Sequence, residues 1–142
     1  MATIQQILNQ KGSTVLSVGP DDSVFDAIKT MATSNIGSLV VLEGEKVVGI
    51  FTERHYARNV FLKGRSSPKT TVKEIMSKHV IYATPDQSVE ECMAVMSDKH
   101  VRHLPVLDGN DLVGIISIGD LVESIIGDQK FVIDQLVHYI SS

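Results

Sequence analysis

The apolar positions in the last third of the chain come in two short runs separated by a turn. Residues 104–107 and 112–116 are mostly apolar, and Asp-Gly-Asn lies between them at 108–110. An Asp-Gly turn between apolar runs predicts a β-hairpin. After the second run, Ser117 precedes apolar residues at helical spacing over 121–126. The pattern therefore predicts a strand that leads directly into the start of a helix.

The same pattern occurs earlier in the chain. Residues 39–42 and 47–51 form two further apolar runs around a turn that contains glycine. With a constant shift of 65 residues and no gaps, 15–56 overlays 80–121, so that turn glycines, cap serines and core positions coincide. This self-similarity indicates a structural repeat rather than shared composition. The apolar residues within each run are consecutive, which is typical of strands covered on both faces.

Each copy predicts a strand, a helix, two strands and a final helix. We expect a short strand at 15–18, helices that begin after the cap residues Ser23 and Ser88, and a short helix at 3–9 that precedes the first copy. The final helix of the second copy is predicted to end near Gly127.

This order of elements predicts a mixed α/β (α+β) fold. Two β-α-β-β-α repeats, related by a pseudo-twofold axis, are expected to pack as one module with two related clefts. Residues 1–66 would hold the first repeat with its N-terminal helix and linker, 67–128 the second repeat, and 129–142 a separate amphipathic helix. A unit of roughly 60 residues has a poor core of its own, so two repeats are expected to share one.

The composition is ordinary for a globular protein. Of 142 residues 43% are hydrophobic, and a single cysteine excludes a disulfide framework. The apolar runs are too short to cross a bilayer, and the first residues lack the pattern of a signal peptide. We therefore expect a cytoplasmic protein that has no membrane partner.

Charge gives a weaker signal. The formal net charge of −4 argues against a general nucleic-acid binder. Six of the 13 Lys and Arg residues nevertheless fall within 54–73, with no acidic residue among them. This stretch is interpreted either as a solvated helix and linker or as a surface that faces an anion.

Polar side chains stand at the start of each final helix. Ser117 is followed three residues later by Asp120, and Thr52 is followed by His55 at the same spacing. A carboxylate can accept hydrogen bonds from both hydroxyls of a ribose, and the free N–H groups of a helix start favour phosphate. The alternative is that Asp120 only helps Ser117 to cap the helix.

The doubled pattern resembles a tandem pair of cystathionine-β-synthase (CBS) domains, the arrangement called a Bateman module, in its free-standing form. The resemblance covers about Thr3 to Ile126 and rests on the strings SLVVLEGEKVVGIFTERHYAR and HLPVLDGNDLVGIISIGDLV. It implies a regulatory, signal-transducing module that binds AMP, ADP, ATP, NAD or S-adenosylmethionine. The family's signature of Gly, apolar residues, Ser or Thr, and a later Asp is complete at 114–120. At 49–55, His replaces the final Asp.

The family's cross-repeat arrangement implies the members of two clefts. The main cleft would contain Thr14, Val15, Leu16, Ile36, Arg102, His103, Ile115, Ser117 and Asp120. A weaker second cleft would contain Ile50, Thr52, Arg54, His55, Arg58, Val80, Ile81, Tyr82 and Val101. Weaker binding is expected there because His55 can donate one hydrogen bond but cannot accept two as a carboxylate does. The plainer interpretations are a surface ion pair for Arg102 and a hydrogen-bonded residue at the edge of the core for His103.

Other classes of function have less support in the residues. The five histidines form no pair with metal-ligand spacing, and no nucleophile elbow or phosphate-binding lysine loop occurs, so we predict neither an enzyme nor a metal protein. The main alternative is a dimerising interaction module without a ligand. In either case a symmetric homodimer is expected, and the output would pass through an unidentified protein target.

Overall fold

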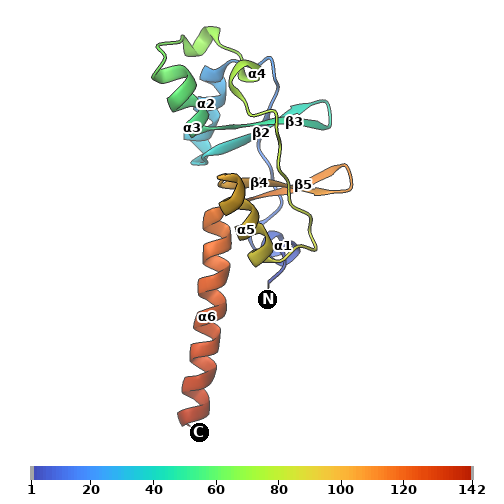
Figure 1. Ribbon diagram of the computed structural model, residues 1–142, viewed down its shortest axis with the longest axis vertical. Coiled ribbons are helices and arrows are strands. Elements are labelled where there is room, and N and C mark those ends of the chain that lie inside the picture. Colours follow the sequence, from blue (N-terminus) through green and yellow to red (C-terminus); the bar gives the residue numbers. More distant parts are fainter. Residues whose placement is uncertain (1, 142) are drawn as a thin grey trace. The chain divides into compact units, whose positions relative to one another are not determined.

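The computed structural model describes residues 2–141 and confirms a mixed α/β fold (Figure 1). The helices and strands are α1 (Ile4–Lys11), β1 (Ser17–Val18), α2 (Val24–Ser34), β2 (Ser38–Glu43), β3 (Lys46–Thr52), α3 (Glu53–Tyr56), α4 (Val72–Ile75), α5 (Val89–Lys99), β4 (His103–Asp108), β5 (Asp111–Ser117) and α6 (Ile118–Ser141). A π-helix, Ala57–Phe61, extends α3, and a 3₁₀ turn, Ser67–Lys69, precedes α4.

The chain divides into two compact units. One unit comprises the residues through Ser13, 82–109 and those from Val113 onward, and the other comprises 14–81 with 110–112. Helix α1 therefore belongs to the unit of the second repeat, although it precedes the first repeat in sequence. The boundaries that the sequence predicts, at residues 66 and 128, follow the repeats in chain order and stay a prediction.

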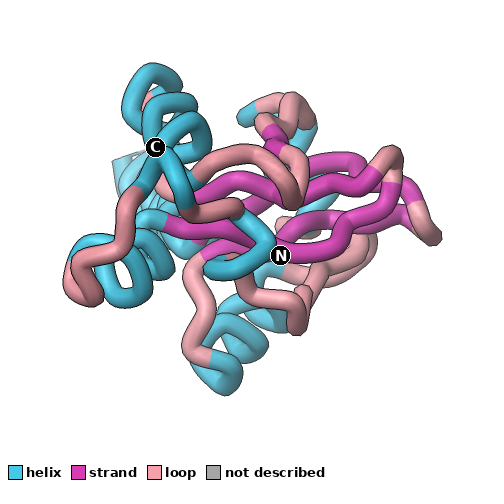
Figure 2. The backbone as a smooth tube through the Cα atoms, turned by 90° about the horizontal axis from the view of Figure 1, so that it is seen from above, coloured by secondary structure: helices cyan, strands magenta, loops and turns pink. Residues whose placement is uncertain are grey.

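The unit of the first repeat is built on a three-stranded sheet. Strand β1 pairs with β2 in parallel, and β2 forms an antiparallel hairpin with β3. The strands are the magenta segments of Figure 2. Strand β2 buries consecutive apolar residues, as the runs predict, whereas β3 alternates between buried and partly buried positions. Helices α2 and α4 and the π-helix supply the rest of the core. Its buried members are Val24, Ala27, Met31, Leu39, Val41, Phe51, Val60, Val72 and Ile75.

The unit of the second repeat has a two-stranded sheet, β4–β5. A third strand at its start, which the repeat predicts, is reduced to one parallel bridge between Ala83 and Val106, and residues 80–82 lie in a loop. Helix α1 is held by backbone bonds, since Ile4 N donates to Gln87 O and Gln5 N donates to Pro85 O, both at 2.9 Å.

The helix starts are confirmed where the sequence has cap residues. Ser23 accepts a hydrogen bond from the backbone of Asp26, and Ser88 with Glu91 forms a complete capping box. Cys92 lies buried on the inner face of α5. Burial, followed by the charge of Glu91, raises the pKa of its thiol to about 11. The thiol is therefore a core group rather than a nucleophile.

The prediction that a helix ends near Gly127 is wrong. Helix α6 runs without a break from Ile118 to Ser141, so that the segment 129–142 is not a separate helix where the structure describes it. Glycine in a helix interior costs only about 1 kcal/mol relative to alanine, which flanking helix-forming residues offset. Within 2–141, no helix is both long and apolar enough to cross a membrane.

Candidate functional site

Ser117 and Asp120 bind each other's backbone at the start of α6. Asp120 N donates to Ser117 Oγ at 3.1 Å, and Ser117 N donates to Asp120 Oδ2 at 2.8 Å. This reciprocal pair satisfies two of the N–H groups that a helix start leaves without partners. Asp120 therefore does help Ser117 to cap the helix, and this cap holds the carboxylate in a fixed position.

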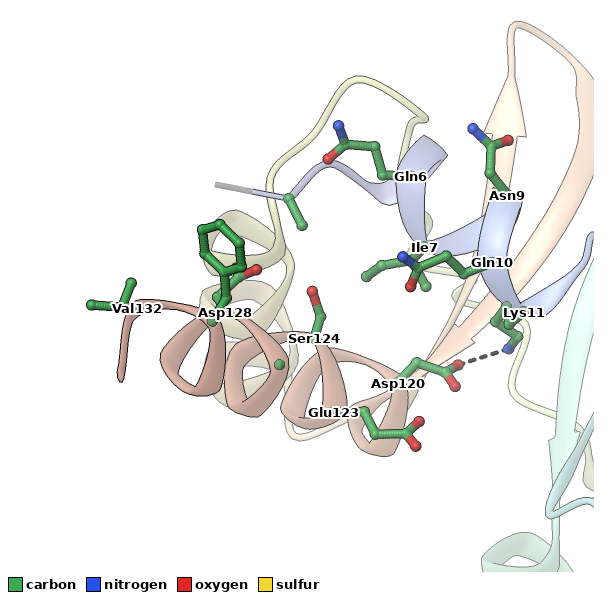
Figure 3. Close-up of a pocket in the computed structure, with 13 residues that line it drawn as sticks. Gln6, Ile7, Asn9, Gln10, Lys11, Asp120, Glu123, Ser124, Asp128 and Val132 are labelled. Atoms are coloured by element: carbon green, nitrogen blue, oxygen red, sulfur yellow. Dashed lines mark hydrogen bonds and ion pairs between the residues drawn. The ribbon is translucent and has the colours of Figure 1, made fainter. Parts of the chain in front are cut away.

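Lys11, at the end of α1, is the second partner of Asp120. Its Nζ donates to Asp120 Oδ2 at 2.7 Å (Figure 3). The same Nζ donates to the carbonyl of Ile115 at 2.8 Å. Oδ2 thus accepts from both Lys11 and Ser117. In the described part of the chain, the other carboxylate oxygen, Oδ1, accepts no hydrogen bond. The carboxylate therefore keeps one oxygen available to a hydroxyl donor.

The side chains of this cluster are only partly exposed, 19% for Asp120 and 35% for Lys11. Burial acts to raise the pKa of Asp120, but the hydrogen bonds from Lys11 and Ser117 outweigh it and hold that pKa below its ordinary value. Asp120 is thus ionised near neutral pH and able to accept.

Arg102 and His103 lie next to the same helix start. The backbone N–H of Ile118 donates to the carbonyl of Arg102 at 2.9 Å, which ties the beginning of β4 to that of α6. Burial lowers the pKa of His103, against the opposite pull of the Asp120 charge. His103 is therefore largely neutral at pH 7 and offers one donor and one acceptor.

An open groove of about 1310 Å³ runs between α1 and α6 (Figure 3). Of the residues predicted to bind a ligand, Asp120 alone lines this groove within the described chain. The other lining residues are Ala2, Gln6, Ile7, Asn9, Gln10, Lys11, Glu123, Ser124, Gly127, Asp128, Phe131 and Val132. The groove gives the carboxylate an open side that polar side chains flank.

The first repeat builds the same cap with different chemistry. Thr52 N donates to His55 Nδ1 at 3.1 Å, and His55 N donates to Thr52 Oγ1 at 3.2 Å. Since Nδ1 accepts a hydrogen bond, the proton of the neutral ring lies on Nε2. Burial, followed by the charge of Arg54, lowers the pKa of His55 and favours that neutral form. His55 therefore presents a single donor where the second repeat presents a carboxylate.

The predicted site residues fall into two groups by unit. In the unit of the second repeat are the main-cleft residues Arg102, His103, Ile115, Ser117 and Asp120 and the second-cleft residues Tyr82 and Val101. In the unit of the first repeat are the main-cleft residues Thr14, Val15, Leu16 and Ile36 and the second-cleft residues Ile50, Thr52, Arg54, His55, Arg58, Val80 and Ile81. The meeting of the two groups in shared clefts stays a prediction.

Sequence reasoning missed Lys11. It lies 109 residues from Asp120 along the chain, in a helix whose pattern carries no chemical motif. No local signal identifies such a contact, because it depends on the packing of α1 in the unit of the second repeat. Among the residues described, no group of three or more His, Cys, Asp or Glu is placed to hold a metal ion.

Comparison with known families gives the context of this geometry. The family model for the CBS domain matches the chain twice, over residues 12–61 and 72–127. The chain belongs to the CBS-domain family. The two CBS matches coincide with the two copies of the repeat, and each contains one of the capped helix starts described above.

Relatives of this chain are also described as CBS-domain proteins. The mitochondrial CBS domain-containing protein CBSX3 of Arabidopsis thaliana is 36% identical over 97% of this chain and 71% of its own length. The solved structure of a protein with CBS domains from Burkholderia ambifaria has 53% sequence identity and a TM-score of 0.87, and the match covers 90% of this chain and 96% of that one.

A third neighbour carries ligands. The CBS domain pair of protein MJ0100, solved in complex with 5′-methylthioadenosine and S-adenosyl-L-methionine, is 26% identical with a TM-score of 0.80. That match covers 90% of this chain and 98% of the neighbour. Both of those ligands contain an adenosine moiety, so the ribose diol is a feature that they share.

Proposed function

We propose that this CBS pair is a regulatory module that binds an adenosine-containing ligand and passes the signal to a protein partner. The observation that carries the proposal is the Asp120 carboxylate, fixed by the α6 cap and with Oδ1 open. The adenosine ligands of the MJ0100 pair add support. The ligand would be AMP, ADP, ATP, NAD or S-adenosylmethionine. The role is regulatory and not enzymatic.

The ribose would bind at Asp120. Oδ1 would accept a hydrogen bond from one hydroxyl of the ribose directly, whereas Oδ2 already accepts hydrogen bonds from Lys11 and Ser117. A second hydroxyl therefore competes with the Lys11 ammonium for Oδ2. Displaced from the carboxylate, that ammonium would pair with a phosphate in ligands that carry one, because it lies in the same groove.

The remaining members of the main cleft would complete the site. Ser117, His103 and Arg102 supply polar groups on the phosphate side, and Ile115 with Thr14, Val15, Leu16 and Ile36 would enclose the base. The second cleft, around Thr52 and His55, would bind more weakly because His55 offers one donor instead of a carboxylate.

Regulation requires that ligand and partner favour the same conformation of the module. We propose that the module acts as a homodimer and that the ligand changes the packing of repeats or subunits. A cytoplasmic location stays a prediction, since one relative is described as mitochondrial.

Isothermal titration with the five adenosine ligands tests the proposal. At least one is expected to bind the wild-type chain, and Asp120→Ala is expected to abolish or strongly weaken that binding. Asp108→Ala, at the exposed end of β4, is the matched control and should bind as the wild type does. Folded protein that gives no heat with any of the five would reject the nucleotide function.

A ligand-free interaction module is the second candidate. It is favoured by the satisfied state of the cap, since Ser117 Oγ accepts from Asp120 N and Oδ2 of Asp120 already holds an ammonium. The same titration separates the two functions, because a module of this kind would bind none of the five ligands while still self-associating.

A further inference from the structure

The second half of α6 exposes an apolar face along its whole length. Every residue from Ile126 to Ser141 is exposed, and α6 continues well past α1 and α5 of its own unit (Figure 1). The large apolar side chains of this face have high exposed fractions: Ile126 58%, Val132 54%, Ile133 58%, Leu136 56% and Ile140 80%. A lone helical segment of about four turns is marginal in water without tertiary packing. This half of α6 therefore needs another surface to pack against in order to be stable.

The face follows a heptad repeat. Starting from Val122 at position a, the seam contains Val122, Gln129 and Leu136 at a, Ile125, Val132 and Tyr139 at d, and Ile126, Ile133 and Ile140 at e. Gln129 is the single polar residue among these positions. Apolar residues at a, d and e form the stripe by which one helix packs along another, and a polar residue at one a position is a known device for fixing register.

We propose that this face packs against the same face of α6 in a second copy of the chain. The proposal rests on the homodimer proposed above and is independent of the ligand. A two-fold contact needs a self-complementary surface. Gln129 meets that need, because an amide both donates and accepts hydrogen bonds and is able to pair with a copy of itself.

The amount of apolar surface is in the range that a dimer requires. The exposed side chains of the seam offer on the order of 500 Å² of apolar area in each copy. Two copies would then bury about 1,000 Å², which reaches the lower bound for a specific interface. A further contact between the unit of the second repeat and the same unit of the second chain would extend this area.

The charges beside the face do not favour a membrane surface. Asp128, Lys130, Asp134 and His138 lie outside the seam, so acidic residues outnumber the one lysine. Helices that lie on anionic membranes are rich in Lys and Arg on their polar side. Asp134 lies at position f, directly opposite the seam, and supplies a matched control site.

Sedimentation velocity of the full chain over a range of concentrations tests the proposal. The wild type is expected to be a dimer. Ile133→Glu should be a monomer, because it places a charge in each half of the seam. It should still unfold cooperatively and lose at most the helical circular dichroism signal of the exposed half of α6. We expect its dissociation constant to rise by roughly 100-fold or more. Asp134→Asn should dimerise as the wild type does, and Leu136→Gln serves as a second seam variant should Ile133→Glu not fold.

The outcomes separate this contact from the function proposed above. Wild-type protein that is monomeric at all concentrations overturns both the α6 contact and the homodimer. The same conclusion follows if the wild type is a monomer that binds to phosphatidylcholine vesicles. Dimers of the folded seam variants overturn the α6 contact alone and place the dimer interface elsewhere. Titration of Ile133→Glu with the adenosine ligands should still give measurable binding, so a loss of the ligand site is distinguished from a failure to dimerise.

Discussion

Asp120 and His55 occupy equivalent positions in the two repeats and perform the same structural task. Each side chain accepts a hydrogen bond from the backbone of the hydroxyl residue three positions earlier. They differ in what remains for a ligand. Asp120 keeps one carboxylate oxygen that accepts, whereas the neutral ring of His55 keeps one N–H that donates. Capping alone is thus compatible with either residue, and the difference between the two repeats lies in what each can offer a ribose.

Replacing each of these residues by alanine compares the two repeats directly. We expect Asp120→Ala to weaken adenosine-ligand binding by at least 10-fold and His55→Ala to weaken it less, because only the carboxylate accepts from a diol. Isothermal titration measures both affinities. Since both variants lose a cap of similar worth, their unfolding free energies serve as the control. Equal losses of affinity would contradict the ranking of the two clefts.

Lys11 is expected to stabilise the fold only while Asp120 is ionised. The pKa of Asp120 is lower in the folded chain than its ordinary value of 3.8. Its contribution is therefore present above pH 3.8 and is lost as the pH falls through the lower, folded value. Lys11→Met should cost up to about 1 kcal/mol at pH 7, since the pair is partly exposed.

Urea unfolding of wild type and Lys11→Met at pH 7 and at a series of pH values below 3.8 measures this dependence. The difference between the two proteins should shrink as the pH falls through the folded pKa of Asp120. A difference that stays constant would show that the bond from Lys11 to the carbonyl of Ile115, which does not titrate, carries the effect.

At the scale of elements, two strand glycines allow another segment to approach closely. A Cβ at Gly49 would meet Met76 Sδ, and it would lie 2.9 Å from the backbone carbonyl of Ser77. A Cβ at Gly114 would meet only the side chain of Leu8, at 2.6 Å. Ser77 is fixed by backbone bonds with Ile50 in both directions, at 2.9 and 3.1 Å. The contact at Gly49 is therefore the less adaptable of the two.

Gly49→Ala should consequently destabilise the chain by about 1–3 kcal/mol, and Gly114→Ala by less, because a leucine side chain can change its rotamer. Urea unfolding monitored by circular dichroism gives both values. A larger loss for Gly114→Ala would contradict the argument and would show that Leu8 is held as rigidly as a backbone.

At Gly127, in contrast to Gly49 and Gly114, we expect alanine to stabilise the chain. Gly127 lies inside α6, and nothing in the described chain comes within 4 Å of a Cβ built there. Gly127→Ala should raise stability by up to about 1 kcal/mol, because alanine has the higher helix propensity. The unfolding midpoint and the helical circular dichroism signal should both increase. A loss of stability would indicate that this position is covered by a neighbour in solution.

Most elements could be predicted from the sequence because their signals are local. The cap residues Ser23 and Ser88, the Asp-Gly turn and the consecutive apolar runs each specify a helix start or a hairpin within a few residues. Longer-range features could not be predicted in this way. The membership of α1 in the unit of the second repeat depends on contacts about 100 residues apart, and the pairing of Lys11 with Asp120 follows from it. The continuity of α6 depends on how its neighbours offset one glycine.

At the scale of the whole molecule, each unit takes a short helix from the other half of the sequence. Helix α4, which follows the first repeat, buries Val72 and Ile75 in the core of that repeat's unit. The backbone N–H of Val24 also donates to Thr70 O at 2.8 Å. Helix α1 serves the unit of the second repeat in the same way, through Ile4, Leu8 and Lys11. The physical units thus differ from the repeats as they are written along the chain.

This difference predicts how fragments of the chain behave. The fragment 14–81 contains β1 to α4 and all nine buried residues of its core, so we expect it to unfold cooperatively in urea. The fragment 1–66 has nearly the same length but lacks Val72, Ile75 and the backbone partner of Val24, and it should show little or no cooperative transition. The reason is that a unit this small has a small net free energy of unfolding, which the loss of two core residues is enough to cancel. Circular dichroism and amide proton dispersion measure both fragments under identical conditions. If 1–66 folded as well as 14–81, the chain-order boundary at residue 66 would be the physical one, and the place of α4 in the first core would be dispensable.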